Sequence, residues 1–193
     1  MKIVVSKLVG SAVTLEPMDE SHREGLRAVA DDNDIWTHMP ASAAGSAFDD
    51  WWETTMARQT SGQDIIYVVR QNDGGEIVGS SRYLTIFPAH GRLEIGYTFY
   101  AKKVWGTAVN PGAKLLLLGH AFETMGVHRV EFKCDERNKR SAAAIAKLGA
   151  KFEGVFREHF LLPSGRYRDS AYYSILISEW PDVKAGLLKR LEA

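Results

Sequence analysis

Apolar and polar positions change their period several times along the chain, and each change predicts a new element of secondary structure. Apolar residues three or four positions apart, with capping residues before them, predict helices at residues 19–30, 48–58, 111–125, 138–147 and 179–191. Asn138 suits the N-cap of the fourth helix and Gly149 its left-handed exit, and residues 72–75 predict a hairpin turn. Runs of β-branched and aromatic residues predict strands at residues 13–15, 65–69, 77–87, 93–100, 129–134, 152–160 and 167–177. Since no repeat or flexible linker interrupts this order, the pattern predicts one mixed α/β domain over residues 1–193.

The predicted strand at residues 93–100 alternates between apolar and more polar side chains. Successive side chains of a strand point to opposite faces of the sheet. The alternation therefore predicts one face with Leu93, Ile95, Tyr97 and Phe99, and an opposite face with Glu94, Gly96, Thr98 and Tyr100.

A loop of small residues connects this strand to the helix predicted from Pro111. Asn110 suits the N-cap and Pro111 the first helical position, where a missing N–H costs nothing. Gly106 and Ala108 allow a ligand to approach the backbone closely, and the helix N-terminus favours negative charge by about 0.3–1 kcal/mol. The loop is thus either an anion-binding loop or an ordinary strand-to-helix turn.

Composition narrows the possible partners. The chain has 24 basic and 24 acidic residues and 45% hydrophobic residues, so it can bury a core but has no general attraction for nucleic acid or anionic lipid. No apolar run approaches the roughly 20 residues that span a bilayer, and no secretion signal is indicated at the start. Cys134 is the single cysteine, which excludes an internal disulfide and leads us to expect a cytoplasmic protein.

Metal and nucleophile chemistry have little support in the sequence. The six histidines show no metal-ligand spacing, so we expect no metal site. Cys134 has no partner base nearby in the sequence and is interpreted as a packed strand residue.

Four motifs in order resemble the GCN5-related N-acetyltransferase (GNAT) family, in particular its RimJ/RimL-like branch. Residues 103–108 (Lys-Val-Trp-Gly-Thr-Ala) are similar to the pyrophosphate loop of the family, and residues 94–97 to the strand before it. Residues 138–150 are similar to the Asn-x-x-Ser helix of the branch, and residues 165–180 to its C-terminal strand. The sequence departs from the family pattern at residues 109–112 (Val-Asn-Pro-Gly), where proline removes one N–H donor.

The resemblance implies a mixed, mostly antiparallel central sheet with helices on both faces. It also implies acetyl-CoA as co-substrate and an amine as acceptor. Members of the family often form dimers, so a homodimer is an open alternative to a monomer. The diphosphate would lie on the backbone amides of residues 105–109, with Lys103 nearby as a point charge, and the backbone at residues 97–99 would align the pantetheine. The residues implied in acetyl-CoA binding are Tyr97, Phe99, Lys103, Trp105, Gly106, Thr107, Ala108, Val109, Asn138 and Ser141.

The resemblance also implies two catalytic residues. Glu94 would accept a proton from the attacking amine, directly or through water; the alternative is a solvated or salt-bridged carboxylate. Ser141 would donate a proton to the departing thiolate from the mouth of a helix capped by Asn138, although asparagine also caps helices without any ligand. Tyr172 and Tyr173 are second choices for this proton donor.

The acceptor stays open between a protein α-amino group and a small amine. Four arginines could recognise a carboxylate or an acidic peptide, or simply be solvated: Arg82, Arg92, Arg166 and Arg168. Two other kinds of function remain as alternatives, a non-catalytic acyl-CoA-binding or regulatory module and a protein-interaction domain that binds no CoA.

Overall fold

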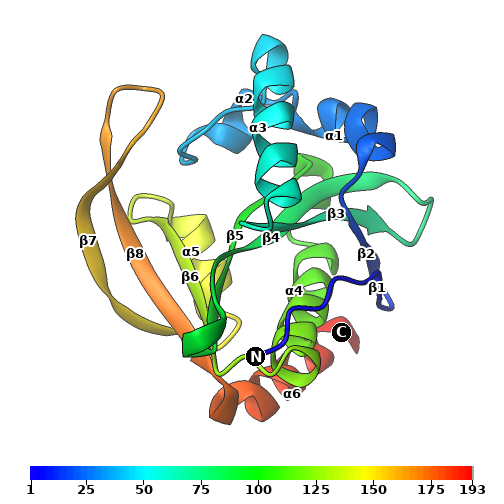
Figure 1. The fold of residues 1–193 in the computed structure, drawn as a ribbon, viewed down its shortest axis with the longest axis vertical. Coiled ribbons are helices and arrows are strands. Elements are labelled where there is room, and N and C mark those ends of the chain that lie inside the picture. The colour runs from blue at the N-terminus through cyan, green and yellow to red at the C-terminus, as the bar shows by residue number, and fades with distance from the viewer. Residues whose placement is uncertain (193) are drawn as a thin grey trace.

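The computed structural model describes residues 1–192, in which eight strands form one sheet with the order β1-β2-β3-β4-β5-β6-β8-β7 (Figure 1). The strands are β1 Leu8–Val9, β2 Val13–Pro17, β3 Ile65–Gln71, β4 Ile77–Phe87, β5 Arg92–Tyr100, β6 Arg129–Asp135, β7 Lys151–Leu161 and β8 Tyr167–Leu176. Within this part of the chain every neighbouring pair is antiparallel except β5 and β6, which run parallel. The prediction of a mixed, mostly antiparallel sheet is confirmed.

Helices cover both faces of this sheet (Figure 1). One face carries α1 Arg23–Ala30, α2 Asn33–Trp36 and α3 Phe48–Thr60, and the other carries α4 Val109–Gly119, α5 Lys139–Ala146 and α6 Trp180–Glu192. A π-helical turn, His120–Thr124, extends α4, and short 3₁₀ turns lie at Glu20–His22, Gly45–Ala47, Pro88–His90, Lys102–Val104 and Ile177–Glu179. Among residues 1–192 no helix has the length and apolar character needed to cross a membrane.

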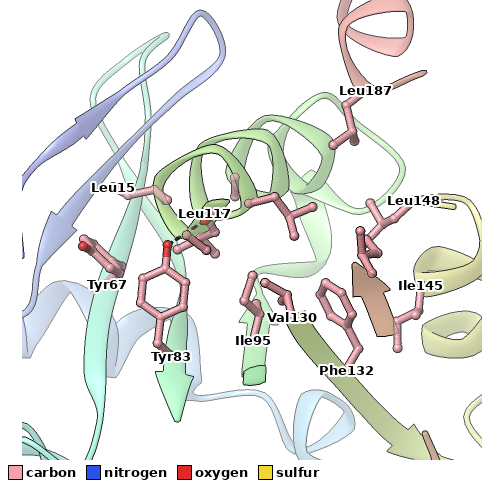
Figure 2. Close-up of a cluster of buried hydrophobic side chains, with 14 of the residues drawn as sticks. Leu15, Tyr67, Tyr83, Ile95, Leu117, Val130, Phe132, Ile145, Leu148 and Leu187 are labelled. Carbon is pink, nitrogen blue, oxygen red and sulfur yellow. Dashed lines mark hydrogen bonds between the residues drawn. The ribbon is translucent and has the colours of Figure 1, made fainter. Parts of the chain in front are cut away.

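Two apolar clusters hold the layers together, one on each face of the sheet. In the larger cluster α4 lies over the sheet, with Leu117 on the helix and Ile95, Val130 and Phe132 on the strands below it (Figure 2). The buried Tyr83 hydroxyl donates a 2.7 Å hydrogen bond to the Leu117 carbonyl oxygen, so its polar group is satisfied inside the core. The smaller cluster packs aromatic side chains of α2 and α3 against β3 and β5: Trp36, Phe48, Trp51, Trp52 and Phe99.

The caps show which local predictions hold. The Asn138 side chain accepts a 3.0 Å hydrogen bond from the Ser141 N–H, and Gly149 has a φ of +93° just after α5, as predicted. The predicted start of α4 is wrong, because the helix begins at Val109 and Asn110 lies inside its first turn. Pro111 fits the third position because the N–H groups of the whole first turn lack intrahelical partners.

The predicted faces of β5 are wrong beyond its middle. The ladder with β4 shifts register there, and Tyr97 adopts a φ of +47°, which marks a β-bulge. The extra residue reverses the faces that follow it. Phe99 therefore packs against Trp36, at 4.9 Å between ring centroids, while Tyr100 joins Leu93 in the larger cluster.

Candidate active site

A cavity of about 240 Å³ opens where the two parallel strands separate. β5 and β6 pair over only three residues each, ending at Glu94 and Glu131. Beyond these pairs the cavity is lined by residues 95–100 of β5 and residues 132–135 of β6. The backbone of β5 on that side has no ladder partner in the described chain, so its polar groups are available to a ligand.

The floor of the cavity is apolar and belongs to the larger core cluster. Figure 2 shows the four side chains that form this floor, and all four line the cavity: Ile95 on β5, Phe132 on β6, Ile145 on α5 and Leu148 just after α5. A ligand with an alkyl chain can therefore lie against the core, while its polar groups meet the free edge of β5.

The loop before α4 offers three unpaired amides. Gly106 has a φ of +79°, a conformation that glycine adopts without strain. In residues 1–192 the N–H groups of Gly106, Ala108 and Asn110 make no hydrogen bond, whereas Trp105 donates to Lys102 and Val109 to the Thr107 hydroxyl. These amides and the helix dipole make the loop suitable for an anion, with alternate rather than consecutive donors.

The structure gathers six of the residues predicted to bind acetyl-CoA around the cavity: Tyr97, Phe99, Trp105, Gly106, Asn138 and Ser141. Thr107, Ala108 and Val109 belong to the adjoining loop and helix start but do not line the cavity. Lys103 lies apart from it, because its ammonium group forms an exposed ion pair with Glu76 beside a separate, shallower hollow.

Glu94 lies just behind the cavity wall. It is 2% exposed, and its Oε2 lies 2.8 Å from Nζ of Lys133, which itself lines the cavity. Its Oε1 occupies the space beside Gly96, since a Cβ added to that glycine would lie 2.8 Å from it. Burial raises the pKa of Glu94, and the ammonium of Lys133 opposes this rise.

Ser141 lies at the mouth of α5 beside the Cys134 thiol. Burial raises the pKa of Cys134, so the thiol is protonated near neutral pH and is not an activated nucleophile. Tyr172 and Tyr173 do not line the cavity. The Tyr172 ring packs on Phe156 at 4.3 Å between centroids, and burial raises the pKa of Tyr172 to about 12.

Sequence reasoning missed a buried acid with two basic partners. Asp135 is 1% exposed, its Oδ2 lies 3.0 Å from Nδ1 of His38, and it also pairs with Arg166. Burial raises the pKa of Asp135, but hydrogen bonds from Arg166 and from the Arg137 amide outweigh burial and lower it. The position of Asp135 at the carboxyl end of a parallel strand was the available signal.

A buried lysine, Lys114 of α4, was also missed. It lines the cavity, is 6% exposed, and donates a 2.9 Å hydrogen bond to Oγ1 of Thr98 and a longer one, at 3.4 Å, to Oγ of Ser81. It forms no ion pair in residues 1–192. Burial without a counter-charge lowers the pKa of Lys114 to about 7.

An arginine bridges the two sides of the cavity. Arg140, on α5, places its Cζ 3.4 Å from the centroid of the Trp105 ring, in the loop before α4. Both residues line the cavity, and Arg140 is exposed. The contact brings a cation beside the unpaired amides of the loop. No group of histidine, cysteine, aspartate and glutamate side chains in residues 1–192 is arranged to hold a metal ion.

The chain has a mixed sheet whose parallel strands separate around a cavity, with an amide-bearing loop ahead of a helix, and solved structures of this fold are acetyltransferases of the α/β class. The family model described as acetyltransferase (GNAT) domain matches residues 12–151. The chain belongs to the GNAT family, and the predicted family is confirmed.

Relatives and solved structures agree with this assignment. The chain is 27% identical over 113 residues to p20 of Bacillus licheniformis, an uncharacterized N-acetyltransferase, covering 58% of this chain and 61% of p20. The chain spans about three fifths of the length of the curated relatives that it matches first. A GCN5-related N-acetyltransferase from Brucella melitensis superposes with a TM-score of 0.90 at 28% identity, covering 99% of this chain and 87% of that one.

The fold also matches a CoA-bound structure. RimJ of Mycobacterium smegmatis, solved with CoA-disulfide, has a TM-score of 0.78 at 21% identity, and the match covers 92% of this chain and 88% of RimJ. This likeness concerns the fold alone. GNAT enzymes use acetyl-CoA, and the cavity described above is the place to test for it.

Proposed function

We propose that the protein transfers the acetyl group of acetyl-CoA to a primary amine by direct attack. The observation that carries the proposal is the cavity between β5 and β6, which joins an unpaired strand edge to a loop with three free amides. A linear thioester that ends in a diphosphate needs both features, one for its amide-containing chain and one for its charge.

In the proposed complex the diphosphate binds the amides of Gly106, Ala108 and Asn110. Arg140 supplies the neighbouring positive charge, since Lys103 is engaged with Glu76. The pantetheine chain follows the free edge of β5 and rests on the apolar floor. The backbone at the Tyr97 bulge would then polarise the thioester carbonyl, because its irregular conformation leaves polar groups outside the ladder.

The proposed reaction needs a neutral amine. Its nitrogen attacks the carbonyl carbon, a C–N bond forms, and the C–S bond of the thioester breaks. We assign the amine proton to Glu94, whose raised pKa suits a base that works near neutral pH. Because Glu94 lies behind Gly96 and Lys133, the proton would pass through water or through Lys133, which returns to its charged form afterwards.

The departing group is a thiolate, and we assign Ser141 as the nearby hydroxyl that donates a proton to it. This contribution is modest, since a thiol pKa near 8.5 already makes the thiolate an acceptable leaving group. His38, held by Asp135 and facing the same cavity, is a second candidate for the base. The single buried cysteine favours the reducing cytoplasm as the place of action.

The test is release of CoA thiol from acetyl-CoA in the presence of a panel of amines and peptides, with the product identified by its mass. We expect turnover that depends on the amine and falls in Glu94→Gln. Tight acetyl-CoA binding without turnover across the panel would favour a binding module instead. Absence of any thermal stabilisation by saturating acetyl-CoA would favour a domain that binds no CoA.

A further inference from the structure

The charged groups around the cavity divide into ion pairs and three basic side chains that form none within residues 1–192: Lys114, Arg140 and Arg168. Glu94 pairs with Lys133 at 2.8 Å, and Asp135 pairs with Arg166. Arg168 lines the same cavity and takes part in no ion pair within residues 1–192. Arg140 is exposed and stacks on Trp105, and burial lowers the pKa of Lys114 to about 7. Arg168 is therefore the buried, permanently charged side chain of the cavity that has no carboxylate in ion-pair contact.

Arg168 is buried, with an exposed fraction of 4%, and is held by neutral groups. Its Nε donates a 3.1 Å hydrogen bond to Oγ of Ser170, and its Nη1 donates one of 3.1 Å to the His38 carbonyl oxygen. Its Cζ lies 5.3 Å from the centroid of the Phe160 ring. The guanidinium is thus fixed from three sides, while Nη2 makes no hydrogen bond in the described chain.

The other arginines that could read a carboxylate are already occupied. Arg82 pairs with Asp64 and Arg92 with Glu131. Burial lowers the pKa of Arg168, and the nearby carboxylates of Asp135 and Glu94 oppose this from a distance, with neither in ion-pair contact. A carboxylate ligand in direct contact would therefore stabilise the buried charge further. A guanidinium with a free N–H edge suits a carboxylate, because its planar fork matches the two oxygens.

The position of Arg168 separates it from the expected place of the CoA phosphates. The phosphate loop leads into α4, on one face of the sheet. Arg168 donates to the backbone of His38, which follows α2 on the opposite face. The β5 bulge and Cys134 line the same cavity as Arg168, and the thioester of the proposed complex ends there. The acceptor would therefore reach the thioester from the side of Arg168.

We propose that Arg168 binds a carboxylate of the acceptor, so that the preferred acceptors are primary amines carrying a carboxylate on the same molecule, as amino acids do. The proposal rests on the acetyl transfer argued above. It also predicts that polyamines are poor acceptors, because Arg168 would repel a second ammonium group where a carboxylate should bind.

The test compares each amino carboxylate with its own carboxamide as acceptor, across α-, β- and γ-amino acids, and includes spermidine as a polyamine. We expect the carboxylates to have KM values about tenfold or more below those of the carboxamides, as one charge-assisted hydrogen-bond pair provides. This preference opposes the intrinsic reactivity, since the carboxamides have the less basic and more readily deprotonated amines.

The variant Arg168→Gln should remove the preference, raising KM for carboxylates about tenfold while leaving kcat/KM for carboxamides within about twofold. Arg168→Lys should recover part of it. The matched control is Arg92→Gln, which removes an arginine from the same sheet outside the cavity and should leave the preference intact. Thermal melts and acetyl-CoA affinity report whether each variant is folded.

Three outcomes overturn the proposal in distinguishable ways. Turnover confined to amines without a carboxylate overturns the role of Arg168 and leaves acetyl transfer standing. Equal losses for carboxylates and carboxamides in Arg168→Gln would make Arg168 a structural or chemical residue instead. If Arg168→Gln does not fold, the KM values of the unmodified protein decide, and equal KM values for carboxylates and carboxamides overturn the proposal. Absence of turnover with every amine removes the proposed function and this proposal with it.

Discussion

Lys114→Met should change how the free energy of unfolding depends on pH. Burial lowers the pKa of Lys114 from 10.5 to about 7, so between these values the unfolded chain binds a proton that the folded chain does not. The stability of the unmodified protein therefore rises with pH relative to Lys114→Met, by about 1.4 kcal/mol per pH unit. Between pH 8 and pH 10 the relative gain is about 2.5 kcal/mol, and below about pH 6 the difference is constant, because both states are protonated.

Methionine is unbranched like lysine and lacks the terminal ammonium group, and the hydroxyls of Ser81 and Thr98, 2.7 Å apart, can satisfy each other without it. Urea unfolding followed by tryptophan fluorescence, at pH 6, 7, 8, 9 and 10, gives the required free energies. Lys189→Met is the control, because it removes an exposed lysine of α6 and should give parallel pH profiles. A difference between the unmodified protein and Lys114→Met that stays constant from pH 6 to pH 10 would refute the reasoning.

Three further predictions concern the active site. Gly106→Glu should abolish acetyl-CoA binding, measured by calorimetry, because it adds negative charge at the phosphate loop. It should also lower the free energy of unfolding by about 1–2 kcal/mol, because it places a Cβ at a residue with φ +79°. An unchanged affinity for acetyl-CoA would refute the loop assignment. Glu94→Gln should lower the amine-dependent rate about a hundredfold at pH 7 and by less at pH 9, where more of the amine is already neutral. If the rate loss in Glu94→Gln is the same at both pH values, and the rate loss in His38→Gln depends on pH, the base is His38. Arg140→Ala should raise the Kd for acetyl-CoA about tenfold with a smaller effect at high salt, and an unchanged Kd would remove Arg140 from the phosphate site.

Elements with a local cause could be predicted from the sequence. The cap at Asn138 and the helix end at Gly149 depend on residues within a few positions of each other, and both appear as expected. The hairpin turn between β3 and β4 is likewise encoded within four residues. Even the wrong start of α4 is a local matter, because proline is tolerated throughout the first turn and does not by itself identify the first residue.

Contacts between distant segments could not be predicted in this way. The ion pair of Glu94 and Lys133 joins residues 39 positions apart, and the contact of His38 and Asp135 joins residues 97 apart. The first contact needs the register between β5 and β6, and the second needs the segment after α2 to lie against the end of β6; no local pattern specifies either. For the same reason the sequence showed Arg168 as one of four similar arginines, and only the pairing of the other three singled it out.

The bulge in β5 explains both the failed prediction and the site. A strand can satisfy regular ladders on both sides only if its side chains alternate without interruption. The extra residue at Tyr97 breaks the alternation, and the strand then pairs with β4 alone while β6 turns away. The cost is a set of backbone groups without partners, which a packed sheet would not tolerate unless a ligand or water satisfied them. The feature that makes the strand hard to predict is therefore the one that opens the cavity, and acetyl-CoA is the ligand that we expect to complete its hydrogen bonds.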